Sequence, residues 1–420
     1  MIGQGYVGLP VAHAAVHAGH TVVGYDVDEQ KIGDLRQGRS PIDDISDNDL
    51  AAMLDTGRYR PADRPSALDG CSTFIVTVPT PLRDGRPDLT AVLAAARAIG
   101  PHLRDGDLVV LESTVAPGTT RGAFRAALAT TAEVHVAFSP ERIDPGNRTW
   151  RFTNTPKLVG GVDAASGKTA CAFYEGICDT VVPVDTAEEA ETAKLLENTY
   201  RYVNIALVNE LGRHTHELGI NVWNVVRAAA TKPYGFQPFF PGPGVGGHCL
   251  PIDPEYLADA VQREAGAGFE FVRLAMQINR AQPAYVVQRI TELLNAERHT
   301  VNGSRILVVG AAYKPDTGDL RESPAVEVTS RLAALGAEVT VYEPHAGNDA
   351  HTPAPSGRGT VSVVDRGDRL AGMLDVSGRF ELAVILTNHS AVPYDAIVRA
   401  VPRVLDTRGT LAVHPRVTTL

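Results

Sequence analysis

The sequence predicts an α/β protein in which two doubly wound parallel sheets are joined by a central helical segment. Three observations support this: a glycine-rich turn followed by a helix and a strand, a long helical pattern in the middle, and a second strand-turn-helix unit after residue 300. The length of 420 residues suits two or three domains of about 100 to 200 residues each. We expect domains over residues 1–180, 181–295 and 300–420.

The chain opens with a dinucleotide-binding fingerprint. Gly3, Gly5 and Gly8 precede an Ala/Val-rich helix and a strand over residues 21–26. The first glycine permits a tight turn, the second admits the pyrophosphate, and the third lets the helix pack closely on the strand. Asp26 is placed to bond the adenosine ribose and to repel a 2'-phosphate. The pattern favours a Rossmann-like domain that binds NAD; a purely structural tight turn is the alternative.

Only Met1 and Ile2 precede this turn, so most of the buried strand that should lead into it is missing. Losing four or five buried apolar side chains at about 1.5 to 3 kcal/mol each would remove much of a stability of about 5 to 15 kcal/mol. We therefore hypothesise that the natural chain begins upstream of Met1.

The remaining segments extend the α/β pattern. Short apolar strands are expected over 74–78 and 108–111, and Thr186 with Glu189 form a capping box that opens a helix running to about Gly219. A helix of that length usually bridges domains or forms an oligomer contact. A second nucleotide-type unit has strands over 305–310 and 337–342; its turn contains Lys314 and Arg321 in place of three glycines, which suits a different diphosphate. Residues 345–359 are predicted to form a loop without evident chemistry.

Composition excludes several classes of function. The formal charge of -10 argues against a nucleic-acid partner, since such binding depends on clustered Lys and Arg. No apolar run is long enough to span a membrane and no signal peptide is evident, so we expect a cytoplasmic protein. Four cysteines and thirteen scattered histidines match neither a disulfide scaffold nor a metal site, and we expect no metal.

Several residues outside the fingerprint could carry chemistry. Cys249 follows a glycine-rich stretch that could present its thiol on a constrained turn, although a buried inert cysteine is the commoner outcome. Lys194 and Asn198 are four residues apart and therefore share one helix face. Their ammonium and amide groups could bind the same oxygen of a ligand, or the face could simply be solvated. Thr114 and Glu141 follow predicted strands, at the edge where open α/β sheets bind ligands.

These segments together resemble the UDP-glucose/GDP-mannose dehydrogenase superfamily along essentially the whole chain. The matching residues are Gly3 to Pro10, Val78 to Pro81, Glu112 to Thr120, Ser139 to Arg142, Lys194 with Asn198, Gly246 to Cys249, and Lys314 with Asp319 to Pro324.

The resemblance implies an NAD-dependent, four-electron oxidation of a sugar C6 alcohol through a thioester on Cys249. Lys194 and Asn198 would hold the reacting oxygen, Asp253 and Thr114 would position water or take a proton, and Glu141 would assist thioester hydrolysis. The implied cofactor contacts are Gly3, Gly5, Tyr6, Val7, Gly8, Asp26, Pro79, Thr80, Thr114 and Arg321. The implied UDP-sugar contacts are Glu141, Arg142, Lys194, Asn198, Phe239, Gly246, Lys314 and Arg408.

The resemblance also bears on substrate and assembly. UDP-glucose dehydrogenases typically have lysine where this chain has Ile252, and the segments around Phe239 and Cys249 resemble the UDP-N-acetylhexosamine branch, most closely the UDP-N-acetylglucosamine type. UDP-glucose and UDP-N-acetylmannosamine remain open as substrates. The family implies a homodimer or higher homo-oligomer formed through the central helix.

Two other functions compete. A two-electron hydroxyacid or 6-phosphogluconate-like dehydrogenase would share the first domain and the long helices but would need neither Cys249 nor a third domain. A non-catalytic NAD-binding module would not require a nucleophile with polar groups around it.

Overall fold

The computed structural model describes the chain apart from residues 43, 84, 145–146, 148, 248–249, 346–358, 365–366 and 377. The expected nucleophile Cys249 and most of the predicted loop 345–359 therefore lie outside the described residues. The chain forms two compact units. Unit 1 comprises Met1–Asn198 and Ile252–Gly268, and unit 2 comprises Thr199–Pro251 and Phe269–Leu420.

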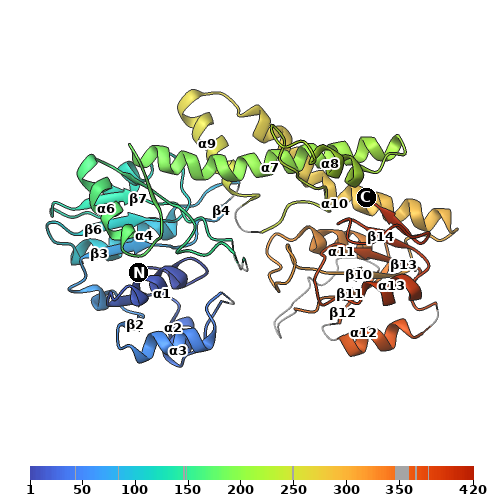
Figure 1. Ribbon diagram of the computed structural model, residues 1–420, viewed down its shortest axis with the longest axis horizontal. Coiled ribbons are helices and arrows are strands. Elements are labelled where there is room, and N and C mark those ends of the chain that lie inside the picture. The colour runs from blue at the N-terminus through green and yellow to red at the C-terminus, as the bar shows by residue number, and fades with distance from the viewer. Residues whose placement is uncertain are drawn as a thin grey trace. The chain divides into compact units, whose positions relative to one another are not determined.

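Unit 1 contains a doubly wound sheet (Figure 1). Its strands lie in the order β2, β1, Ile2, β3, β6, β7, β8, β9, because Ile2 bridges β1 and β3 in parallel. All pairs are parallel except β7 with β8. The strands are β1 Val22–Tyr25, β2 Tyr59–Ala62, β3 Thr73–Val76, β6 Leu108–Leu111, β7 His135–Phe138, β8 Lys157–Gly161 and β9 Val181–Val184, with a small hairpin of β4 Leu82–Arg83 and β5 Arg86–Pro87.

Met1 and Ile2 occupy the place of the first strand. The amide of Ile2 donates to the carbonyl of Ile75, and the amide of Thr77 donates back to Ile2. The amino group of Met1 donates to the carbonyl of Val23 over 2.8 Å, and its burial lowers its pKa to about 6. Ile2 thus joins β1 to β3, and Gly3 adds a bond from its amide to Tyr25 and one from the Thr77 hydroxyl to its carbonyl.

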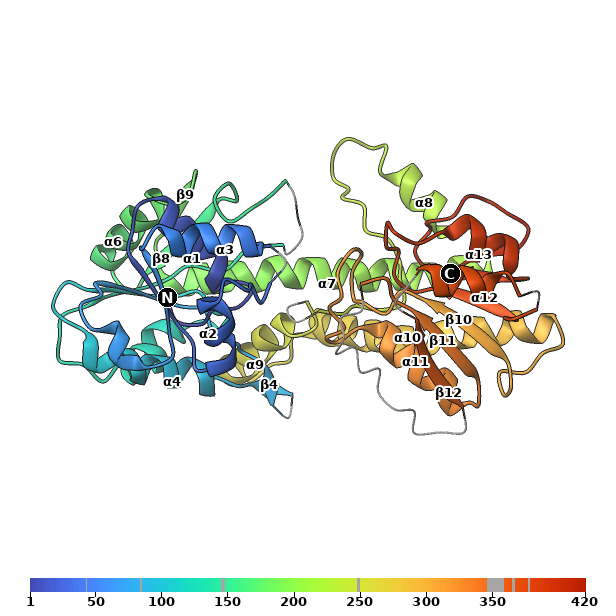
Figure 2. The ribbon, with the colours of Figure 1, turned by 90° about the horizontal axis from the view of Figure 1, so that it is seen from below.

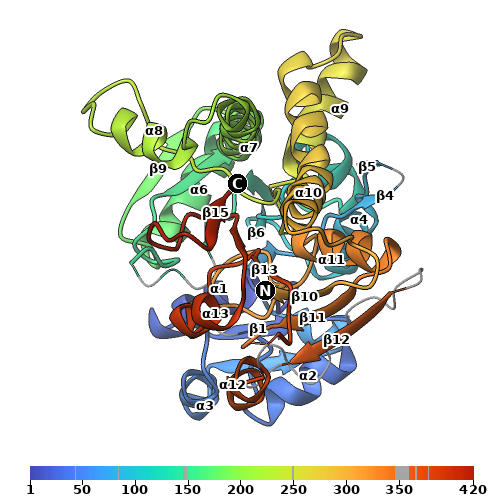
Figure 3. The same ribbon diagram turned by 90° about the vertical axis from the view of Figure 1, so that its right-hand side faces the viewer.

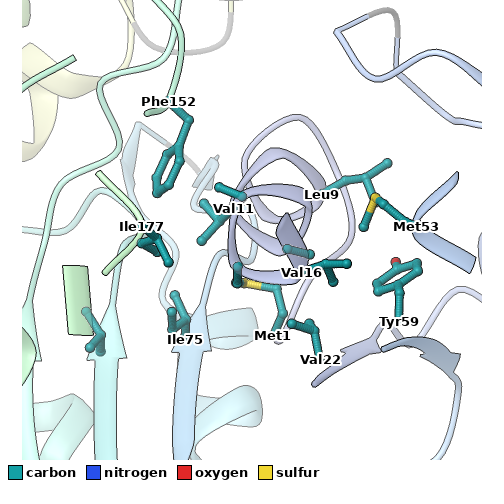
Figure 4. Close-up of a cluster of buried hydrophobic side chains, with 14 of the residues drawn as sticks. Met1, Leu9, Val11, Val16, Val22, Met53, Tyr59, Ile75, Phe152 and Ile177 are labelled. Atoms are coloured by element: carbon teal, nitrogen blue, oxygen red, sulfur yellow. The ribbon is translucent and has the colours of Figure 1, made fainter. Parts of the chain in front are cut away.

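Helices cover both faces of the unit 1 sheet. One core joins α1, α2, α3 and α6 to the sheet, and Leu9, Val16, Met53 and Ile75 all belong to it (Figure 4). The opposite core joins α4 to Phe74 and Val109. The helices of unit 1 are α1 Gly8–His17, α2 Glu29–Arg36, α3 Asp47–Asp55, α4 Thr90–Ile99, α5 Arg125–Ala127, α6 Ala164–Glu175 and α9 Asp253–Ala265, with short turns η1 Pro65–Leu68, η2 Gly100–His102 and η3 Thr120–Phe124.

Unit 2 contains a second, all-parallel sheet in the order β12, β11, β10, β13, β14, β15. Its first strand in sequence lies between the second and the fourth, as in the Rossmann arrangement. Helices α10 and α11 cover one face and α12 and α13 the other (Figure 3). The elements are β10 Arg305–Val309, β11 Glu338–Tyr342, β12 Thr360–Val364, β13 Leu382–Ile385, β14 Val404–Asp406, β15 Val417–Thr419, α8 Val222–Ala229, α10 Glu270–Ala296, α11 Pro324–Ala334, α12 Gly367–Leu374 and α13 Tyr394–Ala400. The predicted class, two doubly wound sheets with a long central helix, is confirmed.

The predicted long helix is α7, Ala187–Glu217, a single uninterrupted helix (Figure 2). The hydroxyl of Thr186 accepts the amide of Glu189, as the capping pattern predicted. The carboxylate of Glu189, however, accepts the amide of Asp185 and not that of Thr186, so the reciprocal half of the box is shifted by one residue. Within the described part of the chain, no helix combines the length and apolar character needed to cross a bilayer.

Candidate active site

The glycines of the first turn have the geometry that a dinucleotide loop needs. Gly3 has φ +93°, a left-handed conformation that side chains disfavour. A Cβ on Gly8 would lie 1.9 Å from the carbonyl oxygen of Gly3, so only glycine lets α1 begin this close to the turn. A Cβ on Gly5 would meet no atom within 4 Å, which leaves that side of the turn open. Tyr6 and Val7 pack against the unit 1 core beneath the turn.

Asp26 closes the same turn from the end of β1. Its carboxylate accepts the amide of Gln4 over 2.8 Å and that of Asp28 over 3.0 Å, and it pairs with the Lys31 ammonium at 2.9 Å. Burial opposes the charge of Asp26, but the bonds from Lys31, Gln4 and Asp28 outweigh it and hold the pKa below its usual value. An ionised carboxylate at this position can accept ribose hydroxyls and repels a 2'-phosphate.

A buried polar cluster lies at the junction of α7 and α9 within unit 1. Lys194 and Asn198 on α7 and Asp253 at the start of α9 are only 6%, 7% and 3% exposed. The Asn198 side-chain amide donates to the Asp253 carboxylate. Burial raises the pKa of Asp253 to about 6, although Lys194 and Asn198 favour the ionised form. Lys194 and Asn198 therefore do not lie on a solvated helix face, which was the alternative interpretation of their spacing. The cluster offers an ammonium, an amide and a carboxylate whose pKa is about 6.

Glu141 joins this cluster from the loop after β7. Its backbone carbonyl accepts the Lys194 ammonium over 2.7 Å, and its carboxylate lies 3.8 Å from the same nitrogen. Burial raises the pKa of Glu141; Lys194 and Lys157 oppose the rise, and Glu112 and Asp253 add to it. A largely buried carboxyl with a raised pKa beside a lysine is suited to proton transfer.

The predicted cofactor loops are anchored to α9. Tyr256, a fully buried residue of α9, donates its hydroxyl to the carbonyl of Thr80 over 3.0 Å. Thr80 is itself buried, whereas Pro79 is exposed. Thr114 lies half-buried directly after Ser113, whose hydroxyl donates to the carbonyl of Val78 over 2.7 Å. The helix that carries Asp253 is thus bonded to the loop expected to hold the cofactor.

Unit 2 holds the glycine-rich stretch before Cys249 against its second nucleotide-type turn. A Cβ on Gly246 would lie 2.6 Å from the carbonyl of Glu322 and 2.9 Å from Pro324. The amide of Gly247, at φ +88°, donates to the carbonyl of Arg321 over 3.2 Å. The backbone can approach this turn only because glycines stand there.

The three cations predicted to contact nucleotides from unit 2 have different neighbours. Arg408 donates to the carbonyl of Leu386 over 2.7 Å, and its guanidinium lies where a Cβ on Gly242 would contact it at 2.9 Å. Burial lowers the pKa of Arg408 to about 10, so it stays charged at neutral pH. Arg321 makes a two-pronged contact with Asp319, and Lys314 lies 5.6 Å over the ring of Tyr313.

The other two residues expected to contact the UDP-sugar, Arg142 and Phe239, interact with neighbouring residues of the protein. Arg142 pairs with Glu197 and donates to the carbonyl of Pro156 over 2.7 Å. Phe239 packs edge-on against Tyr200 with ring centroids 5.7 Å apart. The structure therefore gathers Lys194, Asn198, Asp253 and Glu141 in unit 1. In unit 2 it brings Gly246 to the turn that contains Lys314 and Arg321, while Arg408 lies against Gly242.

Sequence reasoning did not single out three residues of these sites. Lys157 and Tyr256 stand in stretches typical of an ordinary strand and an ordinary helix, and only the fold shows that they are buried beside Glu141 and Thr80. Glu191 was also missed; its carboxylate accepts the amides of Gly118 and Thr120 and so holds the loop after Thr114. A charged residue inside an otherwise apolar pattern was the available signal for Lys157.

Among the described residues, one group of side chains has the spacing of metal ligands. Ligand atoms of Asp316, His345 and His389 lie within 4.8 Å of one another. Nδ1 of His389 accepts the amide of Asp316 over 3.0 Å, and Nε2 lies 3.0 Å from the Glu343 carboxylate. Both ring nitrogens of His389 are thus engaged, which leaves no lone pair for a cation in this arrangement. The absence of a metal stays a prediction.

An alcohol-oxidising dehydrogenase needs a sheet that binds a dinucleotide and, beside it, groups that can hold an oxyanion and take a proton. Unit 1 supplies both, so its fold and site define an NAD-dependent oxidoreductase.

Comparison with known proteins specifies the family. The UDP-glucose/GDP-mannose dehydrogenase family matches with its NAD binding domain at residues 1–178, its central domain at 188–281 and its UDP binding domain at 307–413. The chain belongs to this family, and it is an NAD-dependent nucleotide-sugar dehydrogenase.

Individual relatives cover most of the chain. A UDP-N-acetyl-D-mannosamine dehydrogenase of Methanococcus maripaludis is 34% identical over 351 residues, 82% of this chain and 79% of that protein. A UDP-N-acetyl-D-glucosamine 6-dehydrogenase of Pseudomonas aeruginosa is 35% identical over 354 residues, 82% of each chain. The solved structure of a UDP-D-ManNAc dehydrogenase from Pyrococcus horikoshii superposes with a TM-score of 0.88 at 30% identity, covering 100% of this chain and 97% of that one.

Proposed function

We propose that this enzyme oxidises the C6 alcohol of a UDP-N-acetylhexosamine, with UDP-N-acetylglucosamine as its substrate, to the uronic acid in two hydride transfers. The observation that carries the proposal is the buried cluster of Lys194, Asn198 and Asp253 beside Glu141. A two-electron hydroxyacid dehydrogenase would not need a second carboxyl group for hydrolysis or a UDP binding domain.

In the first oxidation, the turn from Gly3 to Gly8 and Asp26 would hold NAD, which would supply the acceptor for the hydride that leaves the C6 carbon. The ammonium of Lys194 and the amide of Asn198 are donors that can hold the O6 oxygen as charge develops on it. Asp253 takes the hydroxyl proton, which requires its ionised form and therefore a pH above about 6.

In the second oxidation, the Cys249 thiolate adds to the aldehyde carbon, and the thiohemiacetal loses a hydride to a second NAD to give a thioester. Water then attacks the thioester carbon while Glu141 accepts a water proton, and the C–S bond breaks to release the thiol and the acid. One alcohol, two NAD and one water give one carboxylate, two NADH and three protons.

The choice of sugar rests on sequence. Ile252 stands where UDP-glucose dehydrogenases typically have lysine. Two of the relatives described above are named as dehydrogenases of UDP-N-acetylmannosamine and of UDP-N-acetylglucosamine. UDP-N-acetylmannosamine is therefore the second candidate substrate. Both share the acetamido group that UDP-glucose lacks.

The test is NADH formation with UDP-N-acetylglucosamine, UDP-N-acetylmannosamine and UDP-glucose in parallel, with Cys249→Ser as the matched inactive variant. We expect the highest kcat/KM with UDP-N-acetylglucosamine and no acid from the variant. A higher kcat/KM with UDP-glucose would overturn the hexosamine proposal, and acid production by Cys249→Ser would overturn the thioester.

We also propose that the enzyme is a homodimer. Tyr200, Leu207, Leu211 and Leu218 are 46%, 60%, 37% and 71% exposed, and their spacing of seven, four and seven residues puts them on one side of the helical segment. A second copy of the chain could cover this apolar stripe. Leu207→Glu should convert the dimer to a monomer in light-scattering measurements, and an unchanged mass would contradict the proposal.

A further inference from the structure

A second buried lysine lies behind Glu141. Lys157, the first residue of β8, places its ammonium 2.9 Å from the carboxylate of Glu112, and the two side chains are 5% and 0% exposed. Removing both charges from water carries a large desolvation cost, so such a pair is often no better for stability than a well-packed apolar pair. The ion pair therefore calls for an explanation other than stability.

The pair is sealed from solvent by aromatic side chains. Tyr174, fully buried on α6, donates its hydroxyl to the other carboxylate oxygen of Glu112. The Lys157 ammonium lies 5.0 Å from the centroid of the Tyr174 ring and 5.2 Å from that of Phe152. In this apolar enclosure, the electrostatic interactions and hydrogen bonds of the ammonium are strong because water does not screen them.

A further contact of Lys157 leads to the loop that carries Glu141. Its ammonium donates to the carbonyl of Pro140 over 3.3 Å, and Pro140 is the residue directly before Glu141. The carbonyl of Glu141 accepts Lys194 over 2.7 Å. Two consecutive carbonyls of this loop are thus held by lysines from two different elements, β8 and α7.

We propose that Lys157 is a positioning residue for Glu141: it fixes the backbone at Pro140 and, as a nearby cation, favours the ionised form of the Glu141 carboxyl. The proposal rests on the role given to Glu141 in the proposed function, where its carboxylate must accept a proton from water.

Four charged groups act on the Glu141 carboxyl. Lys194 on α7 and Lys157 on β8 lower its pKa, while Glu112 after β6 and Asp253 on α9 raise it. Removing Lys157 alone would leave Glu112 buried without a counter-ion and shift the balance toward protonated Glu141. Removing Lys157 and Glu112 together would take away one cation and one anion, so their opposite effects on Glu141 would largely cancel. The hydrogen bond from Lys157 to the Pro140 carbonyl would still be lost.

These differences define the experiment. Lys157→Met, the double variant Lys157→Met/Glu112→Gln, and the matched control Lys168→Met, an exposed lysine on α6, are compared with the natural chain. For Lys157→Met we expect kcat to fall at least about tenfold with KM for NAD and UDP-sugar within about twofold, and the acid limb of the kcat profile to move to higher pH. The double variant, which leaves no unpaired charge, should restore the acid limb while kcat stays low.

A measurement without turnover separates this proposal from the proposed function. The carboxyl resonance of Glu141, assigned in ¹³C spectra by its loss in Glu141→Gln, is titrated in each folded variant. We expect its midpoint to rise in Lys157→Met and to stay unchanged in Lys168→Met. An unchanged midpoint in Lys157→Met, or natural kcat in the double variant, overturns the positioning role. If no UDP-sugar is oxidised but the midpoint moves, the proposed function fails and the positioning of Glu141 by Lys157 stands.

Discussion

Asn198 on α7 donates its side-chain amide to the carboxylate of Asp253, the first residue of α9, and both side chains are buried. The bond ties the two helices together at the point where Lys194 also acts on the Asp253 carboxylate. This relationship makes one carboxyl group both a candidate base and a buried charge that opposes folding.

The variant Asp253→Asn should separate these two effects. With no carboxylate to take the alcohol proton, we expect kcat to fall by a factor on the order of 10² to 10⁴. Asp259→Asn, on the same helix but paired with a more exposed Arg263, should keep kcat within about twofold. A kcat of Asp253→Asn close to that of the natural chain would remove Asp253 from the chemistry.

Stability should move the other way. The pKa of Asp253 is raised from 3.8 to about 6 in the folded state, so its contribution to stability is full below pH 4 and is lost as the pH rises through 6. At pH 8, Asp253→Asn should therefore raise the free energy of unfolding of unit 1 by about 1 to 3 kcal/mol. The gain should vanish near pH 4 in urea titrations, and a loss of stability at pH 8 would contradict the assigned burial cost.

Tyr256→Phe should affect the cofactor more than the chemistry. The substitution removes the hydroxyl that bonds the Thr80 carbonyl and leaves the ring packing intact. We expect KM for NAD to rise several-fold with kcat nearly unchanged, consistent with about 1 kcal/mol for one lost hydrogen bond. Tyr394→Phe, which removes a similar hydroxyl-to-carbonyl bond in unit 2, is the control and should leave KM for NAD unchanged.

Asp26→Ser should relax the choice of cofactor. The variant removes the carboxylate that repels a 2'-phosphate, while Lys31 keeps its charge nearby. The ratio of kcat/KM for NAD to that for NADP should fall by at least about tenfold, which corresponds to roughly 1.4 kcal/mol. Asp55→Ser, at an exposed position that ends α3, should not change the ratio. An unaltered ratio in Asp26→Ser would mean that the ribose is not held at Asp26.

Gly246→Ala should weaken UDP-sugar binding. The new Cβ would lie 2.6 Å from the Glu322 carbonyl, so the glycine-rich loop must move away from the turn that contains Lys314 and Arg321. We expect KM for the UDP-sugar to rise about tenfold or more with KM for NAD unchanged. Gly372→Ala, whose Cβ would meet open space on α12, is the control. Equal KM values in both variants would show that the loop is not part of the sugar site.

Features of the molecule that depend on a local sequence pattern could be predicted from the sequence. The fingerprint of Gly3, Gly5 and Gly8 needs only a turn and the helix after it, and the pairing of Lys194 with Asn198 needs only helical spacing. The roles of Lys157 and Tyr256 could not be predicted. Their partners, Glu112 and Thr80, are 45 and 176 residues away in the chain, and only the packing of strands and of α9 brings them together.

We propose that the enzyme carries one sugar alcohol to the acid in two successive hydride transfers. The most direct measurement is the ratio of NADH formed to UDP-sugar consumed when UDP-N-acetylglucosamine is limiting. We expect two NADH per sugar, with uronic acid as the product. A ratio of one, with an aldehyde or ketone as the product, would contradict the four-electron mechanism.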